Sequence, residues 1–487
     1  MLFNSSEFLF IFLPITILIF FALIFTNIKK THILLFISIS SLIFYSYWNI
    51  IHLPLILFSI YLNYWFAKKI VKYRKQKYLF YVLLLNLLIL IYFKYFNFFV
   101  SNINIFLNTK IAEANIALPL AISFFTFQQI AFVVDVYRQK IKDFSFLRYL
   151  TFVSFFPQLI AGPIVRFQEI NPQYLNFKKK IKLILIKRFV VGFSYLLIGI
   201  FKKNCIADNL EKIANKIFNN TNFQDLNLIE QWIGVFAYSF QIYFDFSAYS
   251  DMAIGLAMMF GFILPQNFNS PYKSTSIIEF WKRWHITLSK FINEYLFFPI
   301  CASLTKKFYF NESKFALVTS ILIPTLITFC LSGLWHGASW NFVLWGALHG
   351  VYVCINYFYK YFFNIKLNNI FSGFITFIFV SLAWIPFRSV DFYTTKSIFL
   401  SLFGFNSNLN FENKLLENFD FNEIFLFIIT LIIIFFLKNN SFHFKKNSNS
   451  FLTLNFNVKS ACFMFIILIS ILFFGNKEAE PFIYFQF

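Results

Sequence analysis

The sequence predicts an all-α polytopic membrane protein, and two observations carry that prediction. Hydrophobic residues make up 59% of the 487 positions and charged residues 13%, whereas soluble domains have about 45–50% and about 25%. Apolar stretches close to the length of a membrane span recur from one end of the chain to the other. Because about 20 apolar residues cross a hydrocarbon core of about 30 Å, we expect about ten to twelve spans, some of them re-entrant.

The clearest apolar stretches cover residues 8–28, 79–93, 187–201, 315–331 and 421–437. The first stretch has no basic residue before Lys29. It therefore lacks the charged start of a cleaved signal peptide, and we expect it to remain as the first span. The chain shows no repeat of fixed period and no linker long enough to separate soluble domains. We predict one membrane domain over residues 1–487.

The distribution of charge predicts which loops face the cytoplasm. A net charge of +21 would suggest a nucleic-acid partner in a soluble protein, but here the basic residues gather in short loops at 68–77, 178–188 and 438–446. Basic loops of membrane proteins stay in the cytoplasm. The acidic stretch 391–423 is then expected outside, together with the final residues. We predict a multi-pass protein of the cytoplasmic (inner) membrane, surrounded by lipid bilayer and without a nucleic-acid partner.

Polar groups inside apolar stretches are candidates for function, because a charged side chain in hydrocarbon costs about 2.5–3.5 kcal/mol even on a lenient scale. The stretch "FFPQLIAGPIVRF" (155–167) contains Pro157, Gly162 and Pro163. These residues remove backbone donors and loosen a helix, which predicts either a broken, re-entrant segment or a kinked helix. Arg166 is placed either to meet an anionic group or to lie at the interface.

Two carboxylates occur among aromatic residues in "YFDFSAYSDMAIG" (243–255). On a helix, Asp245 and Asp251 lie about 240° apart, so they do not form a paired acid and base. We predict that each one anchors a loop or a helix end. A proton or cation relay is the alternative.

The stretch 276–300 has the pattern of one amphipathic helix lying in the membrane interface. His285 falls at the edge of its apolar face, where a histidine is more often a structural group than a catalyst. The polar side gathers Glu279, Lys282, Arg283, Lys290, Asn293 and Glu294, and the apolar side gathers Phe280, Trp281, Trp284, Leu288, Phe291, Ile292 and Tyr295.

The stretch "LSGLWHGASWN" (331–341) interrupts an otherwise long apolar run. Gly333 and Gly337 free the backbone to turn or to approach a ligand. Irregular backbone at membrane depth is tolerated where it lines a cavity, so His336 is expected to face one; a cap on a broken helix is the alternative. His349 is expected to be a packing or interface residue. Five scattered cysteines, without metal-ligand spacing, predict no metal site.

Five blocks together resemble the membrane-bound O-acyltransferase (MBOAT) family, and within it the bacterial branch that modifies alginate, peptidoglycan and teichoic acid. They include "SFFTFQQIAFVVDVYRQKI", "YFDFSAYSDMAIGLAMMFGF" and "LSGLWHGASWNFVLWGALHG". The blocks cover 123–141, 155–164, 243–262, 265–300 and 331–350, inside a motif-bearing core of about 116–360.

The resemblance implies a ring of tilted transmembrane helices with re-entrant segments around a central tunnel, which joins a cytoplasmic donor to an outer acceptor. In that family a histidine in the position of His336 is the catalytic base, and one in the position of His285 is also needed. The remaining candidates, for lining the tunnel or supporting the site, are Trp335, Asp251, Arg283 and Asn341.

The implied chemistry suits these residues. An acyl thioester is already activated, so transfer to oxygen chiefly needs a base for the hydroxyl proton, and imidazole, with a pKa near 6.5, suits neutral pH. A dry tunnel would also exclude water as a competing acceptor. We expect acetyl-CoA as the donor substrate, and no bound cofactor or metal.

The last residues, "FIYFQF" (482–487), have the pattern F-x-Y-x-x-F. The pattern is similar to a terminal motif of this branch, which a separate small peptide supplies in the teichoic-acid D-alanyl system. The resemblance implies that Tyr484 accepts the acyl group as a relay. The alternative is a tyrosine of the aromatic belt at the membrane surface.

These inferences together predict an O-acyltransferase that exports acetyl groups for O-acetylation of a cell-surface polysaccharide, with peptidoglycan first. Alginate or another exopolysaccharide, and D-alanyl transfer to teichoic acid, are alternatives. No loop is large enough for an outer catalytic domain, so we expect a periplasmic or membrane-anchored serine-type O-acetyltransferase as partner. Two other classes are alternatives: a secondary transporter using Asp245 and Asp251, and a metal enzyme using His285 and His336.

Overall fold

Helices make up almost all of the described structure. The computed structural model describes residues 1–26, 28–176, 181–220, 226–308, 314–363, 367–405, 418–437, 444–446, 452–454, 464–471, 475 and 480–483. Within these ranges the only strands are β1 (Phe444–Lys446) and β2 (Leu452–Leu454), which pair antiparallel with Phe444 opposite Leu454. Apart from this short hairpin, the predicted all-α class is confirmed.

The helices follow one another along the chain. In the first part they are α1 (Leu13–Phe25), α2 (Lys30–Ser46), α3 (Leu53–Tyr73), α4 (Gln76–Leu90), η3 (Ile91–Tyr95), α5 (Phe96–Leu107), α6 (Ile122–Tyr137), α7 (Phe146–Ser154), α8 (Phe156–Leu159), α9 (Phe167–Asn176), α10 (Ile181–Phe201), η4 (Lys202–Ala207) and α11 (Asp208–Phe218). They continue as α12 (Leu228–Met259), α13 (Ile277–Arg283), α14 (Ile286–Ile292), η7 (Asn293–Phe297), α15 (Phe298–Phe308), α16 (Lys314–His336), α17 (Trp340–Phe362), α18 (Asn369–Arg388), α19 (Phe392–Leu402) and α20 (Phe421–Phe436).

Several of these helices are long and apolar enough to cross a membrane, which confirms a polytopic membrane protein. Within the described residues, five reach 18 residues or more with high hydropathy: Phe8–Phe25, Ile50–Tyr73, Gln76–Leu107, Trp340–Lys360 and Asn369–Arg388. Shorter apolar helices cover Lys30–Ser46, Ile122–Tyr137, Ser320–His336 and Phe421–Phe436. Many of their outward side chains are large and apolar, as at Phe10, Phe58, Phe80 and Ile370, which suits contact with lipid.

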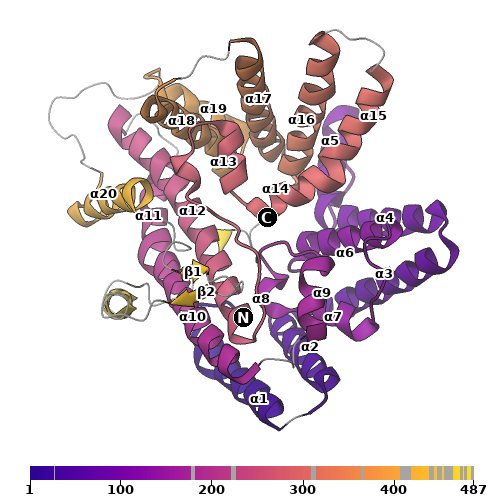
Figure 1. The fold of residues 1–487 in the computed structure, drawn as a ribbon. Coiled ribbons are helices and arrows are strands. Elements are labelled where there is room, and N and C mark those ends of the chain that lie inside the picture. The colour runs from indigo at the N-terminus through magenta and orange to yellow at the C-terminus, as the bar shows by residue number, and fades with distance from the viewer. Residues whose placement is uncertain are drawn as a thin grey trace.

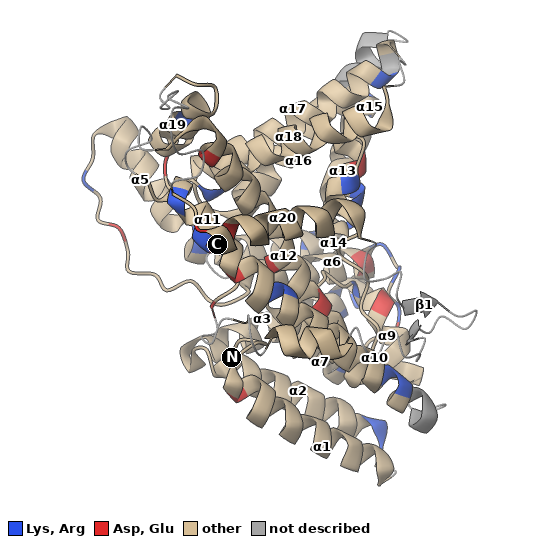
Figure 2. Ribbon diagram, turned by 90° about the vertical axis from the view of Figure 1, so that its left-hand side faces the viewer, with Lys and Arg blue, Asp and Glu red and all other residues tan. Residues whose placement is uncertain are grey.

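The helices are arranged around a central region, with α1 and α2, α3 and α4, α15 to α17, and α10 to α12 on successive sides (Figure 1). Lysine, arginine, aspartate and glutamate lie mostly at helix ends and in loops, and the helical bodies are largely free of them (Figure 2). Successive spans α2, α3 and α4 alternate in direction, so the turn at 47–52 and the loop at 108–121 lie opposite the basic turn at 74–75. The basic turn is expected in the cytoplasm, which predicts that 47–52 and 108–121 lie at the outer face.

The stretch 155–167 is broken, as the first of its two interpretations predicts. Helix α7 ends at Ser154, α8 covers only four residues, and irregular backbone leads on to α9. Arg166 then meets two carboxylates, Glu169 at 3.1 Å and Glu294 of η7. The break therefore brings this stretch into ionic contact with the segment that contains His285.

The prediction of one amphipathic helix over 276–300 is wrong. The chain forms α13, α14 and η7, with a sharp break at Trp284 and His285. His285 has a φ angle of 39°, in the left-handed region that only over-determined surroundings maintain for such a residue. Helical periodicity cannot reveal a break of one residue that is stabilised by contacts from elsewhere, here by Asn267, whose carbonyl oxygen accepts from the Ile286 N–H at 2.9 Å.

Candidate active site

His336 is the last residue of α16, at the tip of an antiparallel hairpin formed with α17. Two glycines let the helices approach closely near this tip: a Cβ on Gly333 would lie 2.1 Å from the Phe342 carbonyl oxygen, and one on Gly346 would lie 2.2 Å from that of Phe329. Ser339 begins α17 by accepting a hydrogen bond from the Asn341 N–H at 3.2 Å. The sequence therefore ends one helix and starts the next so that the imidazole lies at the turn.

The end of α16 is held by a lysine and a tyrosine from η3. The Lys94 ammonium donates to the carbonyl oxygens of Trp335 (2.6 Å) and His336 (3.0 Å), and the Tyr95 hydroxyl donates to that of Leu334 (2.9 Å). The last carbonyls of a helix have no partner within it, and a positive charge there complements the helix dipole. Lys94 is partly buried. Lys94 is not among the residues predicted above, although a lysine inside the apolar run "LILIYFKYFNFF" is a signal for it.

The imidazole of His336 lies in an aromatic environment and is 4% exposed. Its ring centroid lies 4.7 Å from that of Trp335, 4.9 Å from Trp345 and 5.3 Å from Phe387. Trp335 in turn stacks on Phe127 of α6, with centroids 5.1 Å apart and planes 15° apart. These rings fix the orientation of the imidazole and keep bulk water away from most of it.

His336 nevertheless faces a cavity of about 220 Å³. The cavity walls include Trp335, Lys94 and Ser123 near the histidine, and Trp48 together with residues 118–121 farther out. Trp48 and 118–121 belong to the loops of the predicted outer face. The cavity therefore leads from the imidazole toward that face.

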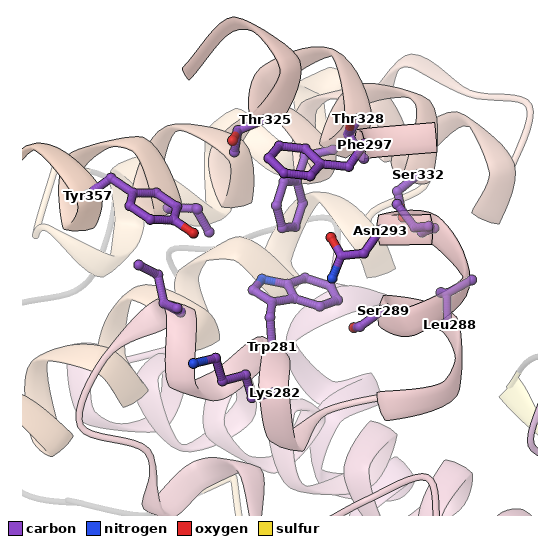
Figure 3. A pocket seen from close by; sticks show the side chains of 14 residues that line it. Trp281, Lys282, Leu288, Ser289, Asn293, Phe297, Thr325, Thr328, Ser332 and Tyr357 are labelled. Atoms are coloured by element: carbon purple, nitrogen blue, oxygen red, sulfur yellow. The ribbon is translucent and has the colours of Figure 1, made fainter. Parts of the chain in front are cut away.

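A second cavity, of about 170 Å³, lies between the α13–α14–η7 segment and the α16–α17 hairpin (Figure 3). Trp281, Ser289 and Asn293 line one side, and Thr328 and Ser332 line the other (Figure 3). Its walls are mainly apolar and carry several hydroxyl and amide groups. Ser332 lies about one helical turn before His336, so the two cavities approach the same end of α16.

His285 is fully buried and held by Asn267. Its Nδ1 lies 3.1 Å from Asn267 Oδ1, which also accepts from the Thr287 hydroxyl at 2.9 Å and the Thr287 N–H at 3.3 Å. The amide nitrogen of Asn267 donates to Ser250 of α12 at 3.2 Å. His285, Lys94 and His349 are close enough to His336 to interact with it electrostatically. The structure thus brings His285 and His336, 51 positions apart in the sequence, into one buried region.

His349 is confirmed as a packing residue. It is fully buried, its Nδ1 accepts a hydrogen bond from the Trp281 indole at 3.3 Å, and its ring lies against Phe280 and Trp345. It connects α17 to α13, and through Trp345 it supports the ring beside His336.

Comparison with known proteins identifies the protein family to which a chain with this site belongs. The family model of the membrane-bound O-acyltransferases matches residues 20–355, more than half of the chain. The chain belongs to the membrane-bound O-acyltransferase (MBOAT) family. It is therefore a multi-pass membrane O-acyltransferase, and the resemblance that its five sequence blocks indicate is confirmed.

Relatives of this MBOAT chain modify bacterial surface polymers. A peptidoglycan O-acetyltransferase of Helicobacter pylori is 35% identical and aligns over 100% of this chain and 98% of its own length. A probable alginate O-acetylase of Pseudomonas aeruginosa is 34% identical over 84% of this chain and 76% of its own. A teichoic acid D-alanyltransferase of Streptococcus thermophilus is 28% identical over 49% of this chain and 56% of its own.

Of the four supporting candidates in this MBOAT chain, Trp335 lines the cavity of about 220 Å³ beside His336. Asn341 and Asp251 connect different helices, and Arg283 pairs within its own helix α13. The Asn341 amide donates to the carbonyl oxygen of Ser389, just after α18, at 2.9 Å. Arg283 forms an ion pair with Glu279 one turn away (2.7 Å), about a third exposed. Asp251 pairs with Lys202 at 2.7 Å.

Asp245 is buried and anchors other parts of the chain, as its sequence position predicts. It accepts from the Lys203 ammonium (2.8 Å) and from the backbone N–H of Ile483 (3.0 Å). Both carboxylates that a transporter would use are therefore engaged with lysines. The predicted relay residue Tyr484 lies outside the residues that the structure describes, although 480–483 are described.

No metal centre is evident in the described part of the MBOAT chain, where no three His, Cys, Asp or Glu side chains gather as metal ligands would. Cys205, Cys301, Cys330 and Cys354 are free thiols, and Cys462 lies outside the described residues.

Proposed function

We propose that this MBOAT enzyme takes acetyl from acetyl-CoA on the cytoplasmic side of the inner membrane and passes it outward for O-acetylation of peptidoglycan, with His336 as general base. One observation carries the proposal: the buried imidazole lies at the end of α16, faces a cavity leading toward the outer face, and is one helical turn from a second cavity. An acyl-transfer site in a membrane needs that arrangement, because donor and acceptor must meet while water stays out.

The reaction needs few groups from the protein. A hydroxyl oxygen attacks the thioester carbon of acetyl-CoA, the carbon–sulfur bond breaks, and an ester and free CoA result. His336 takes the hydroxyl proton during the attack and returns it to the leaving thiolate. Lys94 keeps the imidazole in place through its two hydrogen bonds to the end of α16.

The cavity of Figure 3 suits the acyl-carrying arm of the donor. Its apolar walls fit a methylene chain, and Ser289, Asn293 and Thr328 offer hydrogen bonds to amides along such a chain. The donor is a substrate, so the proposal requires no resident cofactor.

Tyr484 is proposed as the first acceptor, which carries the acetyl group as a phenyl ester to the outer side. A serine-type O-acetyltransferase, periplasmic or membrane-anchored, would then take the group from Tyr484 and deliver it to the polymer. Peptidoglycan is preferred because the peptidoglycan O-acetyltransferase of H. pylori aligns over almost the full length of both chains. Alginate or another exopolysaccharide is the alternative, and D-alanyl transfer to teichoic acid comes after both.

The experiment is acetyl transfer from radiolabelled acetyl-CoA to the purified full-length protein in proteoliposomes. The unaltered protein should become labelled, and both His336→Ala and Tyr484→Phe should not. Asp143→Asn is the matched control, because it breaks only an exposed pair with Arg148, worth about 0–1 kcal/mol. Full labelling of the His336→Ala variant would refute the proposed base, and full labelling of Tyr484→Phe would refute the relay.

A further inference from the structure

A second group of buried charges lies between η4, α11 and α12. Lys203, Asp208 and Asp245 are 1%, 3% and 1% exposed. The Lys203 ammonium lies 2.8 Å from an oxygen of each carboxylate. Removing such charges from water is costly unless their remaining donors and acceptors also find partners. This cluster, Lys203–Asp208–Asp245, therefore requires further polar contacts from nearby chain.

The segment Glu480–Ile483 supplies those contacts. The Pro481 carbonyl oxygen accepts a hydrogen bond from Lys203 at 3.1 Å, and the Ile483 N–H donates to Asp245 Oδ2 at 3.0 Å. An ammonium has three donors, and Lys203 uses two of them on Asp245 and the Pro481 carbonyl oxygen, while Asp208 lies at ion-pair distance. The segment from Pro481 to Ile483 thus adds one acceptor for Lys203 and one donor for Asp245 to the cluster.

The side chain between these two hydrogen bonds is also fixed. Phe482 is 1% exposed, and its ring centroid lies 4.8 Å from the Lys203 ammonium. The Phe482 ring also packs edge to face against Tyr249, which lies one turn after Asp245 on α12. The two ring centroids are 4.8 Å apart and the ring planes are 87° apart. Two hydrogen bonds and one inserted ring leave the segment a single register on the protein.

We propose that Lys203 and Asp245 are positioning residues: they form an internal receptor for Pro481–Ile483 and thereby hold in register the tyrosine that follows it. The inference rests on the relay role proposed for Tyr484. Recognition is through one backbone carbonyl, one backbone N–H and one aromatic ring. The receptor therefore selects a neutral segment with an aromatic residue at its centre.

The seating of the segment can be measured without any acetyl transfer. The five native cysteines of the full-length protein are changed to alanine, and Ile483→Cys is introduced as the single thiol. The rate at which a maleimide–polyethylene glycol modifies this thiol is measured in membranes. The measurement is repeated after Asp245→Asn is added to the same protein. Lys203 and Ile483 bind different oxygens of Asp245, and asparagine replaces one of these oxygens by an NH₂ group that cannot accept, so one of the two contacts is lost in the present geometry. The rate should rise about tenfold or more, as expected for the loss of a hydrogen bond to a charged group.

Two further variants keep this test interpretable. Lys202→Gln is the matched control, since it breaks the neighbouring pair with Asp251 (2.7 Å), and it should leave the modification rate unchanged. If Asp245→Asn does not reach the membrane, Phe482→Ala is used in its place. Phe482→Ala removes the inserted ring and leaves the ion cluster intact. An unchanged rate in the usable variant overturns the receptor.

Acetyl transfer from acetyl-CoA, measured in the cysteine-containing protein, separates the receptor from the relay. Faster maleimide modification together with a kcat about tenfold lower, at an unchanged KM for acetyl-CoA, supports the positioning role. Faster modification with an unchanged kcat overturns the positioning role. If Tyr484→Phe is inactive in the same assay, the proposed relay stands without that role. Full activity of Tyr484→Phe overturns the proposed relay itself.

Discussion

The two histidines of the site are buried to a similar degree but held in different ways. His336 lies at the end of a regular helix. Its backbone carbonyl accepts a hydrogen bond from Lys94, and its ring faces the cavity of about 220 Å³. His285 lies at a break between two short helices, in a left-handed conformation, and its ring is tied to Asn267. The difference supports the proposal that His336 is the group that reaches a substrate, and we propose that His285 maintains the site around it.

The largest effect is expected from His336→Ala. Loss of a general base lowers acyl transfer by about 10²–10⁴-fold. Because the imidazole faces a cavity, the folded state should lose little stability, and the thermal midpoint of the purified protein should stay close to that of the unaltered protein. Transfer rates and a thermal melt on the same sample check both points, and normal transfer by the folded variant would remove His336 from the mechanism.

His285→Ala should lower transfer less, by about 100-fold, and should also destabilise the protein. Displacement of a neighbouring reacting group by about 1 Å is enough for such a loss of rate. The deleted ring leaves a hole beside Phe246, whose centroid lies 4.7 Å from it. Asn267→Ala is the informative partner variant, because it leaves both rings in place and removes the group that fixes His285. If His285 acts through its position, Asn267→Ala and His285→Ala should lower stability and transfer rate to a similar extent. If the two variants differ from each other more than they differ from the unaltered protein, the positioning interpretation of His285 is wrong.

Lys94→Met should reduce transfer by about tenfold. The change keeps the length of the side chain and removes both hydrogen bonds to the end of α16, a contribution of about 1 kcal/mol to holding the tip. Lys94→Arg retains the charge and serves as the control, with activity nearer to normal. A Lys94→Met enzyme with unaltered kcat would show that the tip needs no such support.

The smallest effect is expected from His349→Phe. This ring packs against Phe280 and Trp345 and has one hydrogen bond, from Trp281. The substitution should cost about 1 kcal/mol of stability and leave transfer within about twofold of normal. A loss of transfer comparable to that in His336→Ala would give His349 a role in the reaction.

The sequence predicts the membrane class, the break after His336 and the family, because each depends on local composition or on motifs along the chain. It does not predict the break at His285, because that break depends on Asn267, 18 residues away. It also does not reveal that Lys94 reaches the end of α16, or that Lys203 binds the carbonyl of Pro481. Both contacts span more than 200 positions and are made to backbone atoms, so no pattern of side chains records them.

The central claim is that position 336 is reached by the acceptor from outside and by the donor from inside. The most direct test is His336→Cys in a cysteine-free protein, oriented in vesicles and treated with a small, membrane-impermeant thiol reagent. We expect modification from the outer side, slowed when acetyl-CoA is present on the inner side only. A thiol that reacts from neither side, or one whose reaction is unaffected by acetyl-CoA, would contradict the account.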